Sequence, residues 1–176
     1  MADDPDLHRA LGLIVTGWTG LEFVSGTMLF AALGGTDESI VRVIVAGQRI
    51  QNLWDTTGEI LRTFGKDAAP TLVIFKQWRG IADGYRVKRN EAIHSPWAIR
   101  ESDNQPAAID VFSRKASQGI RTDLFPGGVD DLLELAQDIN TCTDGGQHLR
   151  ARIQGIVAMR AAEGDRGRQE RKPGDL

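Results

Sequence analysis

Three side chains near the middle of the chain have the types and the spacing needed to act on a phosphodiester. Arg89, Asn90 and His94 fall within the segment KRNEAIHSPW, residues 88–97. A histidine exchanges a proton near neutral pH, and an arginine holds a phosphate through its planar fork. Together they supply the acid–base help and charge stabilisation that cleavage of RNA by its own 2′-hydroxyl requires. This scheme needs neither a metal ion nor a cofactor, and we expect none.

The spacing of the pair limits how it can work. A helix advances about 100° per residue, so Asn90 and His94 share a face, whereas Arg89 and His94 are offset by roughly 140°. They converge if the helix loosens at Ser95-Pro96, or if two copies of the chain meet across a two-fold axis. We therefore predict a homodimer that brings the two 88–97 segments together. Asn90, one turn before His94, is expected to orient the phosphate or the imidazole.

Other common chemistries find no support in the sequence. It contains no G-x-x-x-x-G-K-[ST] phosphate loop and no G-x-S-x-G nucleophile elbow. Three histidines and one cysteine do not form a zinc pattern, so no metal site is predicted. The net charge of -3 gives no overall attraction to nucleic acid, so RNA binding requires a local patch. Arg86, Lys88 and Trp97 are the candidate RNA contacts around the pair.

The expected compartment is the cytoplasm. A single cysteine, Cys142, rules out an intrachain disulfide, and the acidic start MADDPDLHR lacks the features of a signal peptide. Residues 11–33 are long and nearly uncharged, which raises the alternative of a membrane span. Glu22 lies at the centre of that stretch, where an acidic residue costs about 2.5–3.5 kcal/mol on insertion scales. We therefore favour a helix buried within a bundle and expect no membrane contact.

Caps and stop residues divide the first part of the chain into three predicted helices, spanning about residues 4–33, 36–64 and 70–95. Asp4 and Pro5 suit an N-cap and a first helical position, and Gly34-Gly35 suits the end of that helix. Gly65 ends the second helix. Pro96 stops the third, because it disfavours a helical conformation at the residue before it.

Glu22 and Arg89 are predicted to meet. Glu22 recurs at helical spacing with apolar residues of the first helix, and Arg89 lies on the apolar stripe of the third. Buried charges are costly unless they are paired. We therefore expect Glu22 to face the bundle interior and to orient Arg89, or another polar group near the motif, as a supporting residue.

The pattern changes after the third helix. Residues 97–101 and 107–115 are rich in strand formers and predict a small antiparallel hairpin. From Pro126 the chain is helical again, and Gly145-Gly146 is expected to bend or split this last helix. The predicted fold is all-α, an up-down bundle of four to five helices with the β-hairpin between the third and last long helices. Residues 1–160 are expected to form a single domain and 161–176 a disordered polar tail.

The motif resembles that of a known family. Arg89-Asn90-x-x-x-His94, at the end of the third helix, is similar to the R-x4-6-H motif of HEPN (higher eukaryotes and prokaryotes nucleotide-binding) domains, in which a polar residue often follows the arginine. The first helix, with GWTGLEFVSGTMLFAAL, and Trp97 resemble a bacterial HEPN-like group of mostly uncharacterised proteins. The resemblance covers about residues 7–155.

The resemblance implies a dimeric helical bundle in which Arg89 and His94 of both chains form a metal-independent endoribonuclease site, assisted by Asn90. It also implies a role as a toxin or defence effector, with an antitoxin or another operon-encoded protein as partner. HEPN members modified by a nucleotidyltransferase carry a tyrosine two residues after the histidine, where this chain has Pro96. Two alternatives stay open: a noncatalytic RNA- or nucleotide-binding module, and a dimeric protein-interaction scaffold.

Overall fold

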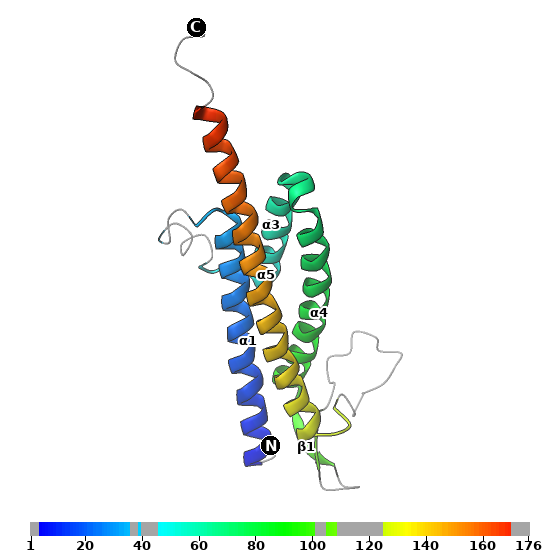
Figure 1. Ribbon diagram of the computed structural model, residues 1–176. Helices are drawn as coiled ribbons and strands as arrows, with labels where there is room; N and C mark the ends of the chain where they lie inside the picture. Colours follow the sequence, from blue (N-terminus) through cyan, green and yellow to red (C-terminus); the bar gives the residue numbers. More distant parts are fainter. Residues whose placement is uncertain (1–3, 36–38, 40–45, 101–104, 109–124, 170–176) are drawn as a thin grey trace. The chain divides into compact units, whose positions relative to one another are not determined.

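The computed structural model describes residues 4–35, 39, 46–100, 105–108 and 125–169 (Figure 1). Over these residues the chain is all-α, with one two-stranded antiparallel hairpin, as the sequence predicts. The long described helices are α1 (Pro5–Ala32), α3 (Ile50–Thr63), α4 (Ala69–His94) and α5 (Val129–Gln169). A short 3-10 helix, η1 (Gly65–Asp67), joins α3 to α4, and β1 (Trp97–Arg100) and β2 (Gln105–Ala108) separate α4 from α5.

The two ends of α1 follow the predicted signals. The Asp4 carboxylate accepts hydrogen bonds from the backbone N–H groups of Asp6 at 2.9 Å and Leu7 at 3.2 Å, so it is the N-cap. Pro5 is the first helical residue. At the other end, Gly34 and Gly35 adopt φ angles of 86° and 65°, a left-handed conformation that ends the helix.

The second predicted helix is not continuous. Gly47 lies in a turn with a φ of 78°, and α3 begins only at Ile50. Residues 36–38 and 40–45, which were also assigned to this helix, lie outside the described residues. The predicted end is confirmed, since α3 stops at Thr63 and Gly65 follows with a φ of 66°.

Helix α4 and the hairpin form the region around the motif. The helix ends at His94, directly before Ser95-Pro96, which confirms the predicted stop. In the hairpin Trp97 pairs with Ala108 and Arg100 with Gln105. The second strand thus begins earlier than predicted, because Gln105 and Pro106 belong to it rather than to the connecting loop. Residues 109–115, the rest of the predicted strand, lie outside the described residues.

Helix α5 runs through Gly145-Gly146 without a break, so the predicted split is wrong. A Cβ atom at Gly146 would lie 2.5 Å from a Val24 methyl carbon and 3.1 Å from the Trp78 ring. This glycine therefore permits close packing instead of interrupting the helix. The helix also continues to Gln169, so residues 161–169 are helical where a disordered tail was expected. Residues 170–176 lie outside the described residues.

The chain divides into two compact units, each of which includes parts of α1, α4 and α5. Unit 1 comprises Met1–Leu21 and Gly80–Thr143, and unit 2 comprises Glu22–Arg79 and Asp144–Leu176. In unit 2, Trp54 packs edge-on against Trp78 at 6.0 Å between ring centroids. The indole N–H of Trp54 donates to the Ser25 hydroxyl at 2.9 Å, which satisfies a buried polar group.

Unit 1 contains the motif region. Its core is built from residues that are almost fully buried on α1, α4 and α5, namely Leu7, Ala10, Ile14, Leu21, Ala82, Ala92, Leu132 and Ile139. Helices α1 and α5 approach closely here, since a Cβ atom at Gly17 would lie 2.9 Å from the Asn140 side chain. The motif is therefore carried by a helix whose inner face is packed against a firm core.

Helix α1 is the one described helix that is long and apolar enough to cross a membrane. Half of its most apolar stretch is buried within the protein. The buried core helix of a globular protein can have the same length and composition.

Candidate functional site

Arg89 is half-buried in unit 1, and three features define the surroundings of its guanidinium. The guanidinium carbon lies 5.8 Å from the centroid of the Trp18 ring. The Nη1 group donates to Asn90 Oδ1 at 2.9 Å. The Nε atom is buried and has no hydrogen-bond acceptor within the part of the chain that the structure describes. No carboxylate of the described residues lies within ion-pair distance of it.

This environment leaves the Arg89 charge without a partner of opposite sign among the described residues. A buried donor without an acceptor costs about 1–3 kcal/mol. The Trp18 face offsets some of that cost, since a cation–π contact contributes about 0.5–2 kcal/mol. With Nε buried and Nη1 shared with Asn90, the Nη2 end of the guanidinium is left for another group. An anion at that end would supply the missing negative charge.

His94 is the last residue of α4, and its side chain is exposed. The backbone N–H of Ser95 donates to the Glu91 carbonyl at 3.1 Å, so the helical pattern continues past His94. The predicted loosening at Ser95-Pro96 therefore begins too late to turn His94 toward Arg89. In a regular helix the two remain offset by roughly 140°. The described residues therefore show no loosening of the helix that would bring the two side chains together within one chain.

The side chain of Asn90 contacts the guanidinium of Arg89. It is half-buried, and its carbonyl oxygen accepts the hydrogen bond from Arg89 Nη1. The expected role was to orient the phosphate or the imidazole, whereas the observed contact orients the guanidinium. The amide N–H groups of Asn90 are still available to an anion bound at Arg89.

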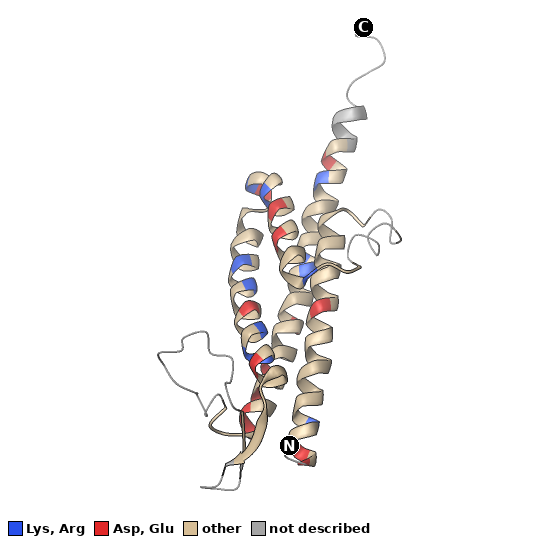
Figure 2. Cartoon of the chain, turned by 180° about the vertical axis from the view of Figure 1, so that it is seen from behind, with Lys and Arg blue, Asp and Glu red and all other residues tan. Residues whose placement is uncertain are grey.

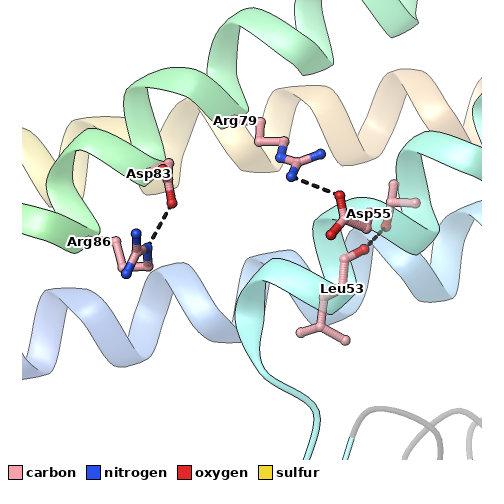
Figure 3. Close-up of polar contacts among 6 residues, drawn as sticks. Leu53, Asp55, Arg79, Asp83 and Arg86 are labelled. Atoms are coloured by element: carbon pink, nitrogen blue, oxygen red, sulfur yellow. Dashed lines mark hydrogen bonds and ion pairs between the residues drawn. The ribbon is translucent and has the colours of Figure 1, made fainter.

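Arg86 and Lys88, two of the predicted RNA contacts, differ in whether their charge is already paired within the protein. Arg86 forms an ion pair with Asp83 on the preceding turn, with 2.7 Å between Arg86 Nε and Asp83 Oδ1 (Figure 3). Lys88 is exposed and keeps its charge toward solvent. Basic and acidic residues alternate along this part of α4, as the colours of Figure 2 show, and Arg86, Lys88 and Arg89 lie in sequence between Asp83 and Glu91.

Trp97, the third predicted RNA contact, packs against other residues of unit 1. Its indole N–H donates to the Ala92 carbonyl at 2.9 Å, near the end of α4. Its ring stacks on Phe125 with 5.8 Å between centroids and 27° between planes. The half-buried Trp97 thus links the hairpin to the end of α4. One face of its ring is covered by Phe125 and is not open to an RNA base.

The prediction for Glu22 is wrong, because its side chain is exposed to solvent. The buried side of α1 instead carries Ile14, Leu21, Val24 and Met28. Most residues of this helix are apolar or small, so several apolar stripes fit the helical period and the sequence does not select among them. The residue of α1 that contacts Arg89 is Trp18.

A further polar cluster in unit 1 was not found from the sequence. Burial raises the pKa of Tyr85, and the nearby Asp138 charge and hydrogen bond raise it further. Burial also raises the pKa of the Cys142 thiol to about 11. Both groups therefore stay protonated near neutral pH and are poor nucleophiles there.

Neither a metal centre nor a groove in unit 1 provides a competing site among the described residues. No group of three or more His, Cys, Asp or Glu side chains among the described residues is arranged to hold a metal ion. The groove is lined by Asp4, Asp6, Arg9, Pro106, Val129, Asp130 and Leu133. Its carboxylates repel phosphate, so the candidate site remains the surface around Arg89 and His94.

Comparison of the chain with known protein families, with curated proteins and with solved structures finds no match.

Proposed function

We propose that the chain is a metal-independent endoribonuclease whose active site forms when two copies meet, each site taking Arg89 from one copy and His94 from the other. The observation that carries the proposal is the half-buried guanidinium of Arg89, which has no carboxylate partner among the described residues. A cation in this setting is suited to a phosphate, which Arg binds through charge-assisted hydrogen bonds.

In the proposed reaction, the 2′-hydroxyl of RNA attacks the adjacent phosphorus and the bond to the 5′-oxygen of the next nucleotide breaks. His94 acts as general acid or base, since its side chain is exposed and histidine is the residue type most often used for proton transfer in enzymes. Arg89 stabilises the negative charge that builds on the phosphoryl oxygens. The products are a 2′,3′-cyclic phosphate and a 5′-hydroxyl.

The regular end of α4 is the reason for placing the site between two copies. Arg89 and His94 of one chain point to different sides of the same helix, so one chain alone does not direct both at one phosphorus. A two-fold dimer that brings the 88–97 segments together supplies the missing group from the other copy. Lys88 adds local attraction for the RNA backbone. The resemblance to HEPN domains favours the same arrangement, in a cytoplasmic toxin or defence effector with an antitoxin or operon partner.

A second candidate function has its own support. The His94 side chain forms no hydrogen bond within the described part of the chain, so its imidazole is not oriented as a general base usually is. This favours a noncatalytic module that binds RNA or a nucleotide through Arg89.

The two functions are separated by an assay on purified protein, with a chelator and a mixed pool of single-stranded RNA. Wild type, His94→Ala and the control His148→Ala, which changes another exposed histidine on α5, are compared. Circular dichroism and light scattering check folding and dimerisation. Cleavage by wild type and the control, but not by His94→Ala, supports the endoribonuclease. Salt-sensitive binding without cleavage supports the binding module, and neither activity overturns both.

A further inference from the structure

We infer that Trp18 is a positioning residue for anion binding at Arg89: it covers one face of the guanidinium and directs the Nη2 end toward the phosphate. This inference rests on the proposed function, because it names the residue that prepares the proposed phosphate-binding group. Trp18 lies on α1 and Arg89 on α4, and both belong to unit 1.

The first step of the argument is the rigidity of Trp18. Its side chain is 5% exposed, so the indole is held by the core of unit 1. The guanidinium carbon of Arg89 lies 5.8 Å from its ring centroid, within the range of a cation–π contact. A flexible arginine placed against a fixed aromatic face loses the freedom to rotate away. Less conformational entropy is then lost when a ligand binds.

The second step is the direction of approach. Nε is buried, so a phosphate cannot take the side-on edge formed by Nε and a terminal nitrogen. Nη1 already donates one hydrogen bond to Asn90 Oδ1 at 2.9 Å. The terminal edge, which presents one hydrogen of Nη1 and one of Nη2, is what remains for a bidentate contact. The burial of Nε and the bond to Asn90 therefore favour an end-on phosphate, and Trp18 holds the guanidinium in that orientation.

The third step is the size of the effect. The Trp18 contact is present before phosphate binds, so only the saving in side-chain entropy counts, and for one ordered side chain this is a factor of roughly 2 to 12 in a binding constant. Replacing Trp18 by leucine keeps apolar bulk and removes the π face, whereas phenylalanine keeps an aromatic face. Trp18→Leu is therefore expected to weaken phosphate binding by about three- to twelvefold, and Trp18→Phe by less than about twofold.

The test uses full-length protein and inorganic phosphate, followed by NMR at the Arg89 Nε–H group, whose burial slows its exchange with water. The matched control is Trp78→Leu, which removes another buried indole that packs on Trp54 and Phe75. The inference predicts that wild type, Trp18→Phe and Trp78→Leu bind phosphate with similar constants. Trp18→Leu should bind it more weakly, with Arg89→Ala as the reference for complete loss.

Two results overturn the inference: equal phosphate binding by wild type and Trp18→Leu, or equal weakening by Trp18→Leu and Trp78→Leu. No phosphate response at Arg89 in wild type overturns it as well. If wild type binds phosphate at Arg89 and depends on Trp18, but does not cleave RNA under the chelator conditions, the positioning role stands while the proposed endoribonuclease fails. Thermal unfolding of each variant identifies a loss of fold. If Trp18→Leu does not fold, the phosphate-binding constants of wild type and Trp18→Phe are compared instead.

Discussion

Substitution of Gly146 by alanine tests the close packing that replaces the expected break in α5. The new Cβ atom would lie 2.5 Å from a Val24 methyl carbon and 3.1 Å from the Trp78 ring, so these side chains must move. Trp78 is itself packed against Trp54, at 6.0 Å between ring centroids, and has little room to shift. Overpacking of this kind costs about 1–3 kcal/mol.

Gly155→Ala is the matched control, because a Cβ atom at Gly155 meets no atom within 4 Å and the residue lies on the same helix. Each substitution gains about 0.8–1 kcal/mol of helix propensity. The difference in unfolding free energy between the two variants therefore isolates the packing cost, and Gly146→Ala should be the less stable by about 1–3 kcal/mol. Urea unfolding followed by far-ultraviolet circular dichroism measures it. Equal stability of the two variants would refute the close packing of Val24 and Trp78 against α5.

Two further predictions concern buried groups. Ser25→Ala removes the acceptor of the Trp54 indole N–H, so the free energy of unfolding should fall by about 1–3 kcal/mol in the same urea experiment, and an unchanged value would count against this bond. The Cys142 pKa is raised from 9.0 to about 11 in the folded protein, so the unfolded chain loses its thiol proton first. Stability should therefore decline as pH rises from about 9 to 11, and Cys142→Ala should decline less; parallel declines in urea titrations across this window would contradict the assignment.

Much of the fold is predictable because the signals at helix ends are local. The Asp4 cap, the left-handed glycines after α1 and the proline after His94 each act on one or two neighbouring residues, and the structure has them as expected. The break before α3 was missed because Gly47 stands alone in an otherwise helical pattern. Gly145-Gly146 was misread because the two side chains that require a glycine come from other helices, which the sequence does not place.

The sequence predicted which residues make up the candidate site, but it did not predict which side chains contact one another there. The sequence placed Arg89 and His94 at the end of one helix, and the spacing already gave their offset. The sequence pattern predicted Glu22 as the supporting residue, because apolar residues occur on several sides of α1 and the pattern does not show which side is buried. Trp18 could be found only from the packing of α1 against α4 in unit 1. The burial of Arg89 Nε likewise depends on neighbours from other parts of the chain.

The most direct test of the shared site is complementation between two inactive variants. Arg89→Ala and His94→Ala are assayed alone and after co-refolding, which forms mixed dimers. If each site takes Arg89 from one copy and His94 from the other, a mixed dimer has one complete site. Random mixing makes half of the dimers mixed, so the co-refolded sample should recover roughly a quarter of wild-type RNA cleavage. A co-refolded sample as inactive as the separate variants, beside an active wild type, would contradict a site shared between two copies.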